Sequence, residues 1–113
     1  MAVEEIEVPY SYPYDVLTTG QDVDVLTLPP KFTFYIDQII VTNNSASPAT
    51  VTIKQKYTGA NNTAATKTLL VVKVDAGTTK VFGNLNLRIT TGTIVVNSSE
   101  AVFILFSGRL KRE

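Results

Sequence analysis

The stretch K-F-T-F-Y-I-D-Q-I-I-V-T-N-N, residues 31–44, is the longest β-like run in the chain. Most of its residues are aromatic or β-branched, which are the types that favour strands. Its apolar side chains alternate in two phases, with Phe32, Phe34 and Ile36 in the first and Ile39 and Val41 in the second. The phases meet at Asp37 and Gln38, so the strand is either buried on both faces or reset by a β-bulge. We expect this strand to lie in the core and to pair with the next one, residues 50–57.

The rest of the chain repeats the same pattern of short strands between turns. Strand-like runs of roughly four to ten residues are separated about every 8 to 12 residues by clusters of Gly, Pro, Asn, Asp and Ser. The turn clusters include residues 20–22, 29–30, 43–48, 75–78 and 91–92. We also expect a short strand to begin at Asp15 and the last core strand to end at Ser107 and Gly108. No stretch has a helical period. The sequence therefore predicts an all-β protein, an antiparallel β-sandwich of about eight or nine strands. Strand count does not separate a jelly roll from another Greek key, and a jelly-roll-like order is our first expectation.

Length and charge limit the domain organisation and the partners. The 113 residues suit a single domain, for which we predict an extended N-terminal arm (1–14), a β-sandwich (15–110) and a basic C-terminal tail (111–113). Ten Lys and Arg residues balance ten Asp and Glu residues, which argues against a nucleic-acid partner. No apolar run is long enough to span a membrane. The first residues lack the basic start and apolar core of a signal peptide, so we expect synthesis in the cytoplasm without export.

The residue types exclude most catalytic chemistry. The chain has no His and no Cys, which removes the usual bases and nucleophiles of hydrolases and the ligands of zinc sites. No spacing brings two acids across a substrate, and no glycine-rich phosphate loop is present. Asp22 and Asp24 share one strand face and could offer oxygens to calcium, but without a complete calcium loop we interpret them as a solvated strand face. We therefore predict no enzyme activity, no cofactor and no metal site.

Three glycosylation sequons begin at Asn43, Asn61 and Asn97. All three lie in predicted turns, where Asn and Ser are common for conformational reasons. We interpret them as turn residues.

The row Tyr10, Tyr12 and Tyr14 is the candidate interface. The three residues alternate with Ser11 and Pro13, so in an extended chain their rings project from one face. Tyrosine gives a large contact area at a small cost in entropy, and an extended arm can reach a neighbouring subunit. The alternative is that the arm folds back and covers its own sandwich.

Residues 32–110 resemble a layout found in small β-sandwich virion proteins of tailed phages and other double-stranded DNA viruses. The resemblance rests on F-Y-I-D-Q-I-I-V-T-N-N-S (34–45), T-V-T-I-K (50–54), V-D-A-G-T-T-K-V-F (74–82), L-N-L-R-I-T-T-G-T-I-V-V (85–96) and A-V-F-I-L-F-S-G-R-L (101–110). It implies a non-enzymatic structural protein of a virion, such as a capsid decoration, minor capsid or tail attachment component. We therefore expect a homo-oligomer that is made in the host cytoplasm and that assembles with itself and with other virion proteins through its sheet faces and the arm. The alternative function is a carbohydrate-binding or receptor-binding module.

Overall fold

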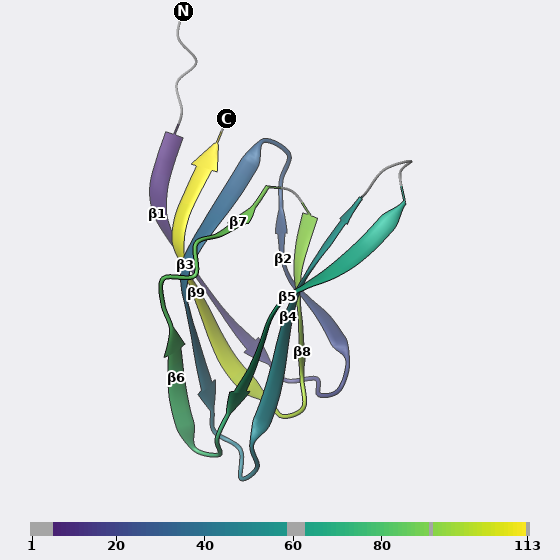
Figure 1. Cartoon of the computed structure of the whole chain (residues 1–113), viewed down its shortest axis with the longest axis vertical. Coiled ribbons are helices and arrows are strands. Elements are labelled where there is room, and N and C mark those ends of the chain that lie inside the picture. The colour runs from purple at the N-terminus through teal and green to yellow at the C-terminus, as the bar shows by residue number, and fades with distance from the viewer. Residues whose placement is uncertain (1–5, 59–62, 91, 113) are drawn as a thin grey trace, which may run out of the picture.

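The computed structural model describes residues 6–58, 63–90 and 92–112, and it confirms the all-β prediction (Figure 1). Within these residues nine strands form two antiparallel sheets, and no helix is long and apolar enough to span a membrane. The strands are β1 (Ile6–Val16), β2 (Asp22–Leu28), β3 (Phe32–Asn43), β4 (Ala49–Thr58), β5 (Ala64–Val74), β6 (Thr78–Phe82), β7 (Leu87–Ile89), β8 (Gly92–Ser98) and β9 (Val102–Arg112).

The strand order is that of a jelly roll. The first sheet has the order β1-β9-β3-β6, with the short β7 also on β3, and the second has the order β2-β8-β4-β5. The two sheets lie side by side in Figure 1, the first on the left and the second on the right. β4 and β5 form the innermost hairpin, and the pairs β3–β6, β2–β8 and β1–β9 nest around it. A long hairpin rolled up in this way gives two facing sheets built from two Greek keys.

The core lies between the sheets and comes from alternate residues of nearly every strand. Its largest fully buried side chains are Phe34, Phe106, Ile36, Ile39, Ile53, Ile89, Ile94 and Ile104. Both phases of the run at residues 31–44 are therefore buried. The structure confirms a β-bulge as the reason, because the register between β3 and β9 shifts between Ile36 and Gln38 and leaves Asp37 exposed.

The predicted pairing of residues 31–44 with residues 50–57 is wrong. β3 pairs with β6, β7 and β9, whereas β4 lies in the other sheet and pairs with β5 and β8. Facing sheets are about 10 Å apart, and five residues in extended form reach about 17 Å. The connection at residues 44–48 can therefore cross between sheets as readily as it can close a hairpin. Alternation in the sequence shows which face of a strand is buried, but it does not show which strand lies beside it.

Two predicted strand limits are also wrong. The run that begins at Asp15 is not a separate strand, because β1 ends at Val16 and residues 17–21 lie outside the strands. The last strand does not end at Gly108, because β9 continues to Arg112. It continues because β1 and β3 flank β9 on both sides up to that residue.

Candidate functional site

The tyrosines of β1 lie on its inner face and pack, half-buried, against the core. The Tyr12 hydroxyl donates a hydrogen bond to the carbonyl oxygen of Val25 on β2, at 2.9 Å. The Tyr10 ring meets Phe34 edge to face, with 5.3 Å between the ring centroids. β1 thus covers its own sandwich and links the two sheets, while the role of Tyr10, Tyr12 and Tyr14 in an interface stays a prediction.

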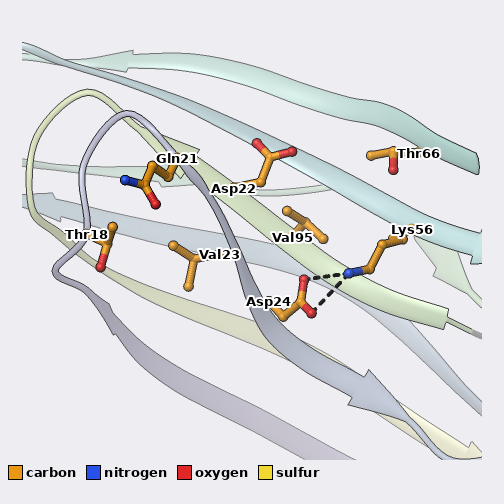
Figure 2. A pocket seen from close by; sticks show the side chains of 8 residues that line it. All are labelled: Thr18, Gln21, Asp22, Val23, Asp24, Lys56, Thr66 and Val95. Atoms are coloured by element: carbon orange, nitrogen blue, oxygen red, sulfur yellow. Dashed lines mark hydrogen bonds and ion pairs between the residues drawn. The ribbon is translucent and has the colours of Figure 1, made fainter.

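The outer face of the second sheet carries two ion pairs that cross the middle strand β8. Lys54 on β4 bonds both carboxylate oxygens of Asp22 on β2, at 3.1 and 3.3 Å. Two residues further along each strand, Lys56 bonds both carboxylate oxygens of Asp24, at 2.9 and 3.0 Å (Figure 2). Residues two apart on a strand share a face, so the four side chains form a ladder. The sequence had indicated the two acids but not the lysines opposite them.

Val95 on β8 lies beneath this ladder. It pairs with Asp24 on one side and Lys54 on the other, and it is only 2% exposed although it lies outside the core cluster. Lysine stems commonly cover apolar surface in this way while the ammonium group stays in water. The ion pairs therefore have a structural role, which is to shield an outward-facing valine.

The Asp22 carboxylate is the most firmly held group of the ladder. A side-chain hydrogen bond from Asn97, at 2.9 Å, and a second from Lys54 lower the pKa of the Asp22 carboxyl below its usual value of 3.8. The carboxylate is still about half exposed, at 48% of its side chain. Each acid is neutralised by a lysine, and the described residues contain no group of three or more potential metal-ligating side chains.

An open hollow of about 540 Å³ lies against this ladder (Figure 2). Its lining comes from the turn before β2 and from β2, β4, β5 and β8, and consists of Thr18, Gln21, Asp22, Val23, Asp24, Lys56, Thr66 and Val95. A smaller hollow of about 380 Å³ adjoins it and shares Lys56. The lining combines carboxylate, ammonium, amide and hydroxyl groups, so it can both donate and accept hydrogen bonds.

The outer face of the first sheet carries a band of apolar side chains, which we call the apolar stripe. Its members lie side by side on four strands of the sheet: Pro13 on β1, Phe103 and Leu105 on β9, Ile40 on β3 and Val81 on β6. Because Val102, Ile104 and Phe106 point into the core, the alternate residues of β9 point outward. Val81 is 57% exposed, and Pro13 is also exposed.

The edge strands of both sheets carry features that disfavour the addition of another strand. β1 contains two prolines, Pro9 and Pro13, which lack the backbone donor that a new partner would need. β2 and β5 are distorted by register shifts, and β5 also carries Lys67 and Lys73. β6 has only five residues. The sheet edges are therefore poorly suited to the addition of another strand.

The sequons have different positions in the structure. Asn43 is fully buried, and its side-chain amide donates to the carbonyl oxygens of Ser47 (2.8 Å) and Val74 (3.0 Å). Asn43 is the last residue of β3 and not part of the predicted turn, but its side chain anchors the turn that follows. Asn97 lies in β8 and not in the predicted turn, because the strand continues to Ser98. Asn61 lies outside the described residues.

No protein-family model matches the sequence, and no curated protein sequence matches it. Solved structures do match the fold. A protein of the T13 particle of the virus IBDV superposes with a TM-score of 0.52 at 11% identity, over 93% of this chain and 30% of that one. The Drosophila NLP-core gives 0.52 at 12% identity, over 88% and 97% of the two chains. Clostridium thermocellum xylanase 10B, in its CBM22-1 and GH10 modules, gives 0.53 at 11% identity, over 96% and 26%.

At these identities the similarity concerns the fold alone. The present chain spans less than a third of the IBDV protein and of the xylanase, but nearly the whole of the NLP-core. A capsid protein, a pentameric core and a glycanase module thus share one β-sandwich architecture. Such an architecture hosts unrelated functions, so function has to be argued from the surfaces described above.

Proposed function

We propose that this chain is a non-enzymatic structural protein of a virus particle, such as a decoration, minor capsid or tail attachment component. In this role it assembles with copies of itself through the outer face of its first sheet, and with other virion proteins. The apolar stripe is the observation that carries the proposal. A stripe that crosses four strands of one sheet face suits packing against a second sheet face.

The protected edges support assembly through a face. An open edge would allow strand addition without limit, whereas contact between two faces stops once both are covered. Residues 6–14 of the arm lie in β1 of this sheet, and Pro13 among them is a member of the stripe. In this arrangement the assembly surface is supported by the three tyrosines of β1, Tyr10, Tyr12 and Tyr14, which pack against the core and hold β1 in place.

The test changes one exposed valine on each sheet. Val81→Lys places a charge within the stripe, and Val71→Lys places one on β5 of the second sheet. The two valines are matched controls because they are 57% and 59% exposed, so neither change disturbs the core. Light scattering over a range of protein concentrations would then give the mass of each variant.

We expect the wild type and Val71→Lys to form the same oligomer and Val81→Lys to shift toward the monomer. A wild-type protein that stays monomeric at concentrations up to about 1 mM would contradict the assembly role. An oligomer of unchanged mass in Val81→Lys would show that the stripe is not its interface.

A carbohydrate-binding or receptor-binding module is the second proposed function. The hollow on the second sheet favours it, since that surface is polar, open and separate from the apolar stripe.

A further inference from the structure

We infer that the hollow on the outer face of the second sheet is a binding site for a neutral carbohydrate. This inference rests on the second proposed function and is independent of the assembly role. The hollow's volume, about 540 Å³, falls within the range of roughly 300 to 1,000 Å³ typical of small-molecule sites.

The charges of the lining favour a neutral ligand. Asp22 and Asp24 are each paired with a lysine, so the ladder has no net charge with which to attract a free cation or anion. A charged ligand would also have to compete with ion pairs that are already formed. A ligand without charge does not face this competition.

The hydrogen-bonding capacity of the lining favours a ligand rich in hydroxyl groups. A carboxylate accepts about four hydrogen bonds, and Asp24 uses two of its positions for Lys56. Its side chain is 59% exposed, so the remaining positions face solvent. A sugar hydroxyl can donate to such a carboxylate and, at the same time, accept from an amide or an ammonium group. Hydrogen bonds to an ionised group are about twice as strong as neutral ones.

The rim of the hollow adds uncharged partners. Thr18 and Gln21 lie on the turn before β2, and Thr66 lies on β5 at the opposite side (Figure 2). Hydrogen bonds from Lys54 and Asn97 hold the Asp22 carboxylate in place before any ligand arrives, and those from Lys56 hold the Asp24 carboxylate. This reduces the entropy cost of binding. The smaller hollow beyond Lys56 offers room for a second sugar unit.

The experiment is a titration of the isotope-labelled full chain, followed by amide chemical shifts. The probes are neutral hexasaccharides of glucose, xylose, mannose and galactose, together with one sialylated and one sulphated oligosaccharide. We expect at least one neutral sugar to shift the amides of Gln21, Asp24, Lys56 and Thr66, with a Kd on the order of 1 mM. The variant Asp24→Asn keeps the shape of the side chain and should weaken binding by roughly tenfold. The control Asp75→Asn removes a carboxylate from an exposed turn outside the lining and should leave binding unchanged.

The other outcomes overturn the inference in distinguishable ways. If no sugar produces shifts at about 10 mM, both the site and the carbohydrate-binding function are wrong. If sugars bind but the shifts map to another surface and Asp24→Asn has no effect, the function stands and this site is wrong. If only the sialylated or sulphated probe binds, the ligand is an anion and not a neutral carbohydrate. The oligomer measurements on the apolar stripe are unaffected by any of these results.

Discussion

Gly108 on β9 lies directly against the backbone carbonyl of Tyr35 on β3. The β-bulge at Asp37 draws the two backbones together, and a Cβ atom at position 108 would overlap the carbonyl oxygen of Tyr35 and lie 3.1 Å from the amide nitrogen of Asp37. Both of these atoms belong to the backbone, so neither can rotate away. Gly108 is therefore required by the bulge and does not mark the end of the strand.

The first prediction is that Gly108→Ala destabilises the protein. Overpacking of this kind costs roughly 1 to 3 kcal/mol, since the two strands must separate to admit the methyl group. Urea unfolding would measure the change in the free energy of unfolding. Gly83→Ala is the matched control because no atom lies within 4 Å of the position a Cβ would take there. An equal loss in both variants would show that close approach is not the cause.

The β-bulge also shows which features of β3 could be predicted from the sequence. The change of phase between Ile36 and Ile39 was visible because strand side chains alternate with a fixed period of two. The strands that pair with β3 could not be predicted from the sequence, because pairing in a sandwich depends on which connections cross from one sheet to the other. The apolar stripe does have a signal in the sequence. The run V-F-I-L-F at the start of β9 is continuous rather than alternating, which indicates apolar side chains on both faces.

The partners of Asp22 and Asp24 could not be predicted for a similar reason. Lys54 and Lys56 have the same spacing as the two acids, but they reach them across β8, which follows both strands in the chain. The hollow depends in turn on Thr66 of β5 and on the turn before β2, which only the rolled topology brings together.

The second prediction concerns Asn43, whose side chain closes the connection between the sheets. Its amide donates to two carbonyl oxygens, and its side-chain oxygen accepts from the backbone amide of Ser45 at 3.0 Å. Asn43→Ala would leave these partly buried groups without partners. Each group that water cannot reach would lower the free energy of unfolding by about 1 to 3 kcal/mol. We expect a total loss of roughly 2 to 4 kcal/mol in urea unfolding. The neighbouring exposed variant Asn44→Ala should change stability little, and a similar loss there would contradict the anchoring role of Asn43.

The third prediction concerns the link between the two sheets. Tyr12→Phe removes the hydroxyl that bonds the Val25 carbonyl oxygen and should lower the free energy of unfolding by about 1 kcal/mol. Tyr14→Phe is the control, because Tyr14 lies on the same face of β1 and no hydrogen bond joins its hydroxyl to the described residues. Thermal unfolding of both variants would separate the effect of losing this hydrogen bond from the effect of removing a tyrosine hydroxyl that makes none. Equal effects would mean that the bond between β1 and β2 contributes nothing.

The fourth prediction is a pH dependence that comes from Asp22. Its pKa in the folded protein lies below the usual 3.8, chiefly because of the hydrogen bond from Asn97 and then that from Lys54. Its contribution to stability is therefore fully present above pH 3.8 and is lost as the pH falls through the lowered pKa. The carboxylate is about half exposed, so we expect less than about 1 kcal/mol, decreasing with salt. As the pH is lowered below about 5, the urea midpoint should fall less steeply in Asp22→Asn than in the wild type or in Asp75→Asn. If the midpoints of all three proteins fall in parallel, the acid sensitivity comes from other groups.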